Sequence, residues 1–370
     1  MLSHEDILFL AFAFLISWMS SYLSIPSIVT VARAKNLCAE SIARSSHSGW
    51  VPNLGGVALF ASLMLGMNFF GNGTDTNDFH CLMGGMVILF FFGIKDDVLV
   101  LDPVKKLAGQ VVVSLIMVYF ADVRLDHFHG FLGLHEIYYP ISLLISVFAM
   151  VVIINAYNLI DGIDGLASGV GLVCSGSFTI WFVINGFYTQ SLIGVSLMGA
   201  LCSFFYFNVY SRRNKLFMGD TGSMIVGLVL GYFVMKFIQL NGAENLKWQI
   251  GASPAVAFGI LIVPLFDVIR VMMVRISRKR SPFHADKSHI HHLLLRAGFT
   301  HKGASFRIIF GNIAFVVLCY FGRDWHSEIL FAAVIGFAIV LTMWVIHMAK
   351  RRRVIRFVFP FGWVRRRKAA

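Results

Sequence analysis

The feature that most constrains this chain is a series of eleven apolar segments separated by short polar loops. A helix that crosses the hydrocarbon core of a bilayer takes about 20 residues, and most of the segments reach that length with their flanks. Charged residues make up only 14% of the chain, compared with about 25% in soluble domains. The composition therefore predicts an all-α polytopic membrane protein with about eleven transmembrane helices. The segments lie at residues 7–31, 54–70, 80–94, 107–121, 140–157, 165–184, 190–208, 222–238, 254–276, 306–322 and 328–349.

The distribution of positive charge predicts the orientation of the chain. An odd number of spans places the two termini on opposite sides of the membrane. Cytoplasmic loops of membrane proteins are enriched in Lys and Arg. With a cytoplasmic C-terminus, 24 of the 31 Lys and Arg residues fall in cytoplasmic loops and the tail, and only Arg124, Lys247 and Arg323 fall in outer loops. This ratio predicts an N-terminus outside the cytoplasm and a C-terminus inside it. It also explains the net charge of +12 without a nucleic acid partner.

The loops are too short for a soluble domain, so we expect one transmembrane domain over residues 1–350. Residues 351–370 mix bases with aromatic residues, and two interpretations stay open for this tail: an anchor on anionic membrane lipids, or a solvated segment that sets the topology. Gly227 and Gly231 have the spacing of a helix–helix contact, which leaves a homodimer open because the same spacing also packs helices within one subunit.

A polar stretch at the junction of two apolar segments, residues 155–166, is the strongest functional signal. Asn155, Asn158 and Asp161 lie three apart and share one face if the preceding helix reaches that far. The two glycines that follow allow a turn, and Asp164 is suited to cap the next helix. Polar groups of this kind are costly in hydrocarbon, so we expect them to face water, protein or a ligand at the membrane surface.

Four more polar clusters fall on the same predicted cytoplasmic face. Asp96 and Asp97 have the oxygen ligands that hard cations such as Mg²⁺ prefer. The sequence Gly219-Asp-Thr-Gly-Ser223 is a good helix start, with Thr221 or Ser223 as the expected cap, and its free amides together with those of the helix after Asp164 suit a diphosphate. The remaining clusters are the first inner loop and a loop with bases and histidines.

The basic, histidine-rich loop is better suited to anions than to a metal. No cysteine lies near His289, His291 and His292, and a lone His-X-His-His is a weak zinc signal. Beside Arg278 and Arg280, imidazoles are able to donate hydrogen bonds to phosphate oxygens. In the preceding segment we expect Pro264 to kink the helix, and Asp267 to pair with Arg270 without a role in chemistry.

These motifs together resemble the polyprenyl-phosphate N-acetylhexosamine-1-phosphate transferase family (glycosyltransferase family 4), in its undecaprenyl-phosphate GlcNAc-1-phosphate branch. The resemblance rests on five pieces in family order between about residues 44 and 300: Asp96-Asp97, Leu101-Asp-Pro-Val-Lys-Lys-Leu107, Asn158 to Leu166, Phe217 to Ser223 and His289 to His292. It implies a Mg²⁺-dependent bacterial inner-membrane enzyme, with Mn²⁺ as a candidate substitute. The implied substrates are a UDP-N-acetylhexosamine and undecaprenyl phosphate, and UMP is released. The same reaction with another UDP-HexNAc or UDP-MurNAc-pentapeptide is the alternative.

The resemblance also implies residue roles. Asp220 would bind the metal, together with Asn158 or Asp97. Asp96 or Asp97 would orient or deprotonate the lipid phosphate, and Asp161 and Asp164 would organise the nucleotide and the metal site. The substrate-binding residues would be Asn155, Phe217 on the uracil ring, and Lys106, Arg278, Arg280, His289, His291 and His292 on phosphates.

Three other classes of protein fit the sequence less well. A transporter or channel predicts ionisable residues near mid-span, where these segments are nearly bare. An intramembrane aspartyl protease explains two aspartates but not the basic, histidine-rich loop. A non-catalytic scaffold has no need of five polar clusters on one face.

Overall fold

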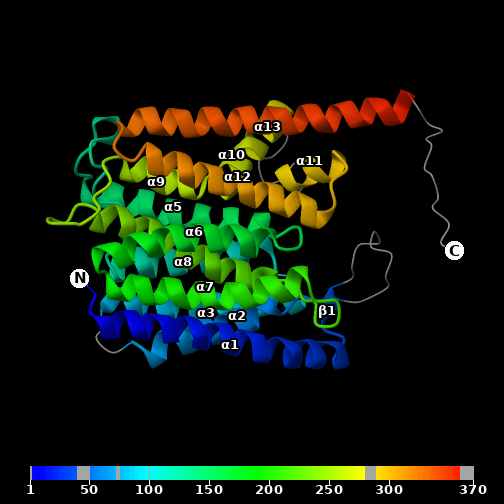
Figure 1. The fold of residues 1–370 in the computed structure, drawn as a ribbon, viewed down its shortest axis with the longest axis horizontal. Coiled ribbons are helices and arrows are strands. Elements are labelled where there is room, and N and C mark those ends of the chain that lie inside the picture. The colour runs from blue at the N-terminus through cyan, green and yellow to red at the C-terminus, as the bar shows by residue number, and fades with distance from the viewer. Residues whose placement is uncertain (1, 40–50, 72–75, 100, 280–288, 359–370) are drawn as a thin grey trace.

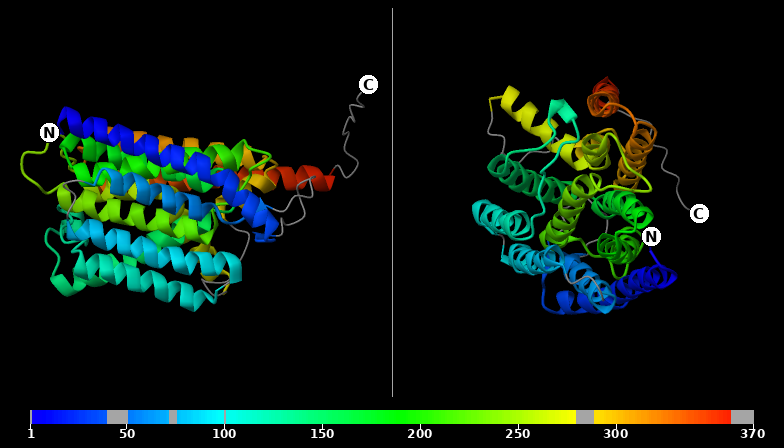
Figure 2. Two further views of the ribbon diagram at one scale, coloured as in Figure 1. Left: turned by 90° about the horizontal axis from the view of Figure 1, so that it is seen from below. Right: turned by 90° about the vertical axis from the view of Figure 1, so that its left-hand side faces the viewer.

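In the computed structural model the described residues are 2–39, 51–71, 76–99, 101–279 and 289–358. They form a bundle of long helices that run nearly parallel (Figures 1 and 2). The elements are α1 (His4–Ala34), β1 (Cys38–Ala39), β2 (Val51–Pro52), α2 (Gly55–Phe69), α3 (Asn77–Leu99), α4 (Pro103–Leu115), the π-helical η1 (Ile116–Phe120), the 3₁₀ turn η2 (Phe131–Gly133), α5 (Tyr139–Ile160), α6 (Leu166–Asn185), α7 (Tyr188–Val209), α8 (Gly219–Leu240), α9 (Ser253–Ile260), α10 (Ile262–Ser277), α11 (Ile290–Arg296), α12 (His301–Phe321) and α13 (Ser327–Val358).

The all-α polytopic class is confirmed. Every predicted apolar segment contains helix. Among the described residues, eight helices are long and apolar enough to cross a membrane, or nine if α9 and α10 count as one bent span, and α2 is a shorter apolar helix. Helix α1 begins at one end of the bundle and α13 ends at the other (Figure 1). The last helix continues to Val358, past the predicted domain boundary at residue 350, and residues 359–370 of the tail lie outside the described part.

Helix α8 is the most buried of the spanning helices and packs against α2, α3, α5, α6 and α9. Small residues allow this close packing. A Cβ atom at Gly227 would lie 2.9 Å from the Cα of Ile154, and one at Gly231 would lie 2.3 Å from Met150 Sδ, both on α5. The Gly227–Gly231 spacing therefore packs helices within one subunit, and it gives no support to a homodimer.

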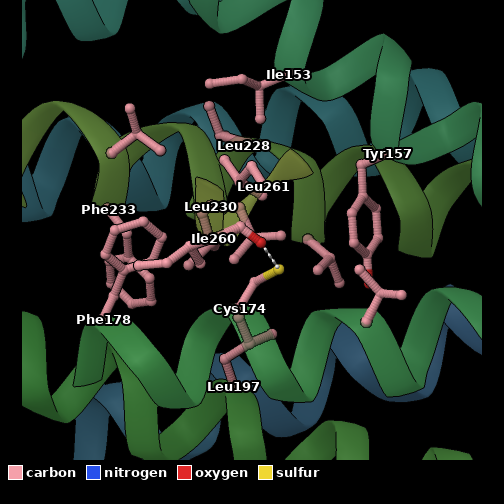
Figure 3. Close-up of a cluster of buried hydrophobic side chains, with 14 of the residues drawn as sticks. Ile153, Tyr157, Cys174, Phe178, Leu197, Leu228, Leu230, Phe233, Ile260 and Leu261 are labelled. Atoms are coloured by element: carbon pink, nitrogen blue, oxygen red, sulfur yellow. Dashed lines mark hydrogen bonds between the residues drawn. The ribbon is translucent and has the colours of Figure 1, made fainter. Parts of the chain in front are cut away.

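The predicted kink near Pro264 is present, and it is a break rather than a gentle bend. Helices α9 and α10 meet at an angle of 79° across Leu261. Because proline has no N–H, the carbonyl of Ile260 lacks its helical partner. It instead accepts a hydrogen bond from Cys174 Sγ at 3.1 Å (Figure 3) and another from Asn312 Nδ2 at 3.0 Å. The break redirects α10 outward across the bundle, as the end-on view in Figure 2 shows.

Candidate active site

Lys106 lies at the centre of a polar cluster where α3, α4, α5 and α8 meet. Its Nζ is 2.5 Å from Asp220 Oδ1, 3.1 Å from Asp96 Oδ2 and 3.2 Å from Asn158 Oδ1. The Asn158 side-chain amide donates to Asp220 Oδ1 at 2.5 Å and to Ser223 Oγ at 2.7 Å. Side chains from three helices, α3, α5 and α8, therefore surround the Lys106 ammonium group of α4 with three oxygen atoms.

Asp97 holds the first turn of α8. Its Oδ1 accepts hydrogen bonds from the Asp220 backbone N–H at 2.8 Å and from Asn53 Nδ2 at 2.9 Å. Its Oδ2 accepts from the Thr221 backbone N–H at 3.1 Å and from the Thr221 hydroxyl at 2.6 Å. The expectation that Thr221 or Ser223 caps α8 is wrong, because the Ser223 hydroxyl donates to a carbonyl of the preceding turn and the cap comes from α3.

Two glycines make this arrangement possible. Gly219 has a φ of 73°, and a Cβ atom there would lie 2.7 Å from both carboxylate oxygens of Asp97. A Cβ atom at Gly93 would lie 2.3 Å from the Cα of Thr221, so the backbones of α3 and α8 are in direct contact. The glycine of the Gly219-Asp-Thr-Gly-Ser motif is therefore required by the conformation and by the approach of Asp97.

Asp161 follows the end of α5 and faces the same cluster. It is half-buried, and burial, followed by the nearby carboxylates of Asp220 and Asp97, raises its pKa to about 7. The backbone N–H of Gly219 acts in the opposite direction by hydrogen bonding to it. The three carboxylates are thus close enough for the charges of Asp220 and Asp97 to raise the pKa of Asp161.

Asp164 has a different environment from the expected one. Its Oδ2 pairs with Lys215 Nζ at 2.5 Å, and it does not cap α6. Gly165, the residue immediately before that helix, has a φ of 76°, and its N–H donates to Asn208 Oδ1 at 2.5 Å. The N–H groups of Gly165, Asp220 and Thr221 are therefore already bonded to Asn208 and Asp97, and these three amides are not free for the predicted diphosphate.

The histidine segment is anchored by Asp267, a buried carboxylate on α10. Its Oδ2 lies 2.9 Å from His289 Nδ1, and its Oδ1 accepts from the Ile290 backbone N–H at 3.0 Å and from Arg270 Nη2 at 2.6 Å. The predicted Asp267–Arg270 pair is confirmed. The contacts to His289 and to the start of α11 show that Asp267 also positions the histidines.

His291 connects this segment to the aspartates. A Cβ atom at Gly162 would lie 2.6 Å from His291 Nε2, so the ring packs against the turn that follows Asp161. The rings of His289 and His291 are stacked with centroids 5.9 Å apart, and the ring of His292 lies 4.2 Å from that of His291. Burial, followed by the neighbouring His292, lowers the pKa of His291 to about 3. His291 is therefore neutral at physiological pH.

The remaining predicted residues lie at the edge of the cluster or outside it. The side-chain amide of Asn155 donates hydrogen bonds to Gln110 Oε1 on α4 and, at 2.9 Å, to the Val151 carbonyl on its own helix, α5. Arg278 is exposed at the end of α10, and Arg280 lies outside the described residues.

Phe217 is half-buried beside the cluster, with Lys215 Nζ 5.8 Å from the centre of its ring. Its backbone is fixed by hydrogen bonds to Pro52 at 2.8 Å and from Gly55 at 2.9 Å. The segment before α2 therefore holds the loop that carries the aromatic ring, and a positive charge lies over the ring.

The donor atoms around Lys106 fit a Mg²⁺ ion that is shared with a substrate. In the described part of the chain, no group of three or more His, Cys, Asp or Glu residues is arranged to hold a metal ion. Mg²⁺ usually binds one or two carboxylates and keeps waters and substrate phosphates as its other ligands. Asp220 and Asn158 supply such a partial set, because their oxygens already point at one cationic atom.

Comparison with known proteins identifies the family. Residues 79–238 match the model of glycosyl transferase family 4. The undecaprenyl-phosphate alpha-N-acetylglucosaminyl 1-phosphate transferase of Yersinia pestis is 30% identical over 264 residues, which are 70% of each chain. This chain belongs to glycosyl transferase family 4. Family 4 relatives with the same name occur in Escherichia coli K12, 28% identical over 277 residues (74% of this chain, 73% of the relative), and in Haemophilus influenzae Rd, 26% identical over 357 residues (95% and 96%).

Sequence reasoning missed four residues that organise this family 4 site: Asn53, Asn208, Lys215 and Asp267. Three of them lie in polar loops or at helix ends, where nothing in the local sequence indicates a distant partner. Asp267 carried a signal, because a carboxylate inside an apolar segment must be paired when it is buried. Arg270, three residues later, satisfies that requirement within the same helix. The sequence therefore provided no reason to expect a second partner, His289.

Proposed function

We propose that this family 4 protein transfers N-acetylhexosamine 1-phosphate, with N-acetylglucosamine as the favoured sugar, from a UDP-sugar to undecaprenyl phosphate and releases UMP. The names of the relatives support the acceptor and the transferred group. The observation that carries the proposal is the cluster of oxygens around Lys106, because phosphoryl transfer depends mainly on positioning and on neutralisation of charge. The product would initiate a cell-envelope glycan of the O-antigen, capsule or teichoic acid type.

The charges of the cluster support a requirement for Mg²⁺. Two lysines pair with the carboxylates, one at Lys106 and one at Lys215, which leaves an excess of negative charge. A diphosphate would be repelled by that excess unless a divalent cation came with it. When bound by Asp220 and Asn158, Mg²⁺ would neutralise the diphosphate and the departing UMP. The carboxylates are Asp96, Asp97, Asp161, Asp164 and Asp220.

The other side chains would bind and orient the substrates. An oxygen of the lipid phosphate attacks the sugar-linked phosphorus in line, and the bond from that phosphorus to the oxygen it shares with the UMP phosphate breaks. Lys106 and the histidines hold phosphate oxygens, and Phe217 stacks on uracil. We assign Asp97 to the positioning of Asp220, because both its oxygens accept hydrogen bonds from α8. The second pKa of a phosphate is about 6, so the acceptor is largely ionised without a strong base.

We further propose that the protein spans a bacterial inner membrane eleven times, with its N-terminus in the periplasm and the site at the cytoplasmic surface. The excess of Lys and Arg in the loops at the site end supports this orientation. The start of α1 and the end of α13 at opposite ends of the bundle agree with an odd number of spans.

A donor panel tests the reaction. Purified protein in detergent with undecaprenyl phosphate and Mg²⁺ is supplied with UDP-GlcNAc, UDP-GalNAc or UDP-MurNAc-pentapeptide, and UMP is measured. We expect release with UDP-GlcNAc that stops on chelation, returns with Mg²⁺ or Mn²⁺, and is absent in Asp220→Asn. Absence of cation-dependent UMP release with every donor would exclude the proposed reaction.

A further inference from the structure

A cavity of about 400 Å³ lies between α10, α11, α12 and α13, and none of the five carboxylates of the polar cluster lines it. This volume is within the range of sites for small ligands, roughly 300–1,000 Å³. Its walls are almost wholly apolar and include Phe266, Leu294, Gly311, Phe315 and Leu341. Such a surface suits a hydrocarbon chain.

The cavity opens at the side of the bundle. Phe310 and Trp344 stand at its rim and are 67% and 56% exposed on the apolar outer surface. Along α12 it extends from Arg307 to Phe315, which is roughly 12 Å at 1.5 Å per residue. A Cβ atom built on Gly311 would meet no atom within 4 Å, so this position faces open space inside the groove. A chain could enter from the bilayer without passing through the protein.

A positive charge stands at one end of the groove. Arg307 is exposed, its Nη1 donates to the Gly303 carbonyl at 2.9 Å, and its guanidinium lies 3.9 Å above the Phe299 ring. Within the described residues, no carboxylate forms an ion pair with Arg307. Asp267 also lines the groove, but Arg270 and His289 pair with it. The groove is therefore mostly apolar along its length and positive at one end, near the end of the bundle that carries the polar cluster.

We propose that this groove binds one acyl chain of an anionic glycerophospholipid, with the phosphate of its headgroup at Arg307. Basic side chains near the membrane surface attract anionic lipids, so the headgroup phosphate is drawn to the end of the groove that carries Arg307. The acceptor lipid fits this groove less well, because α11 stands between the groove and the site. Ile290 and Leu294 of α11 line the groove, whereas His291 packs on the other side against Gly162.

The bound lipid would also support the histidine segment. Ile290 and Leu294 are four residues apart and share one face of α11, and the groove is the space against which that face lies. An acyl chain there presses α11 toward the turn at Gly162 and keeps His291 in place. Loss of the lipid would remove part of the packing on that face, where α12 and α13 also contact α11.

Lipid retention tests the proposal without reference to the reaction. Purified protein is reconstituted with equal amounts of phosphatidylglycerol and phosphatidylcholine, and retained lipid is measured by native mass spectrometry. We expect the wild type to retain phosphatidylglycerol preferentially. Gly311→Leu fills the groove and should reduce retention at least fivefold, whereas Arg307→Gln keeps the groove and should lose only the preference for the anionic lipid.

The matched control is Gly336→Leu on α13. Gly336 also faces open space, but it is exposed and lies outside the groove, so this variant should retain lipid as the wild type does. Equal retention by the wild type, Gly311→Leu and Arg307→Gln would overturn the proposal. Displacement of the phosphatidylglycerol by an equal amount of undecaprenyl phosphate would do the same, because it would identify the groove as the acceptor's site. If Gly311→Leu fails to fold, Arg307→Gln still tests the proposal through its preference for phosphatidylglycerol over phosphatidylcholine.

Measurements of activity test whether the bound lipid supports α11, and they rest on the proposed function. UMP release in phosphatidylglycerol nanodiscs should exceed that in phosphatidylcholine several-fold for the wild type and Gly336→Leu, and should not differ for Gly311→Leu. An equal lipid dependence in Gly311→Leu would contradict the coupling. Absence of UMP release from protein that retains phosphatidylglycerol would refute the proposed function and leave the lipid site standing.

Discussion

Asp97 accepts two hydrogen bonds from Thr221, one from the backbone N–H at 3.1 Å and one from the hydroxyl at 2.6 Å. The first residue is in the last turn of α3 and the second in the first turn of α8, so the pair joins two helices at the site. Because Asp220 precedes Thr221 and donates its own N–H to the same carboxylate, the position of Asp220 depends on Asp97.

Replacement of Asp97 should therefore affect stability and metal dependence together. Asp97→Asn removes the negative charge from the start of α8, and we expect the free energy of unfolding to fall by about 2 kcal/mol. UMP release should fall at least tenfold and require more Mg²⁺. Thr221→Val removes a single hydroxyl contact and should cost about 1 kcal/mol. Denaturant unfolding and Mg²⁺ titrations of activity measure both effects, and wild-type behaviour of Asp97→Asn would contradict the positioning role.

Removal of Lys106 should make the fold dependent on divalent cations. Lys106→Met leaves Asp96 and Asp220 without their shared cation, and we expect a loss of about 3 kcal/mol in the presence of a chelator. Mg²⁺ should restore part of that loss by binding the same oxygens. Lys106→Arg keeps the charge and serves as the control. The expectation fails if Mg²⁺ stabilises both variants to the same extent in thermal unfolding.

Replacement of Asp267 should loosen α11. In Asp267→Asn the amide presents an N–H₂ group where one carboxylate oxygen faces His289 Nδ1, so that contact weakens. We expect faster amide hydrogen exchange in α11 and at least a tenfold decrease in UMP release, with an unchanged Mg²⁺ requirement. Arg270→Lys keeps the charge beside Asp267 and should have a smaller effect. Unchanged exchange in α11 would show that Asp267 does not anchor the segment.

The buried His291 should make the protein less stable in acid. Its pKa of about 3 in the folded state lies below the unfolded value of about 6.5. Between these values the unfolded chain binds a proton that the folded one does not, so stability falls as the pH falls below about 6.5. The wild type should lose about 2 kcal/mol more than His291→Gln between about pH 7.5 and about pH 5. Parallel pH profiles of unfolding for the two proteins would contradict this expectation.

The sequence by itself determined the membrane class, the apolar segments, the break near Pro264 and the family. These properties depend on local composition, on residues adjacent in the chain, or on motifs that can be read in order. It also indicated that Asp97, Asp161, Asp220 and His291 belong to one region, because loops on one side of a bilayer share a surface.

Only the tertiary structure decided which side chain contacts which. The cap of α8 comes from Asp97, more than 120 residues before it, and the partner of His289 is Asp267 on a redirected helix. The Gly227–Gly231 pair packs against α5 and not against a second subunit. Hydrogen bonds and close packing depend on the separation of atoms in space, and that separation is fixed by how the helices pack and not by their order in the chain.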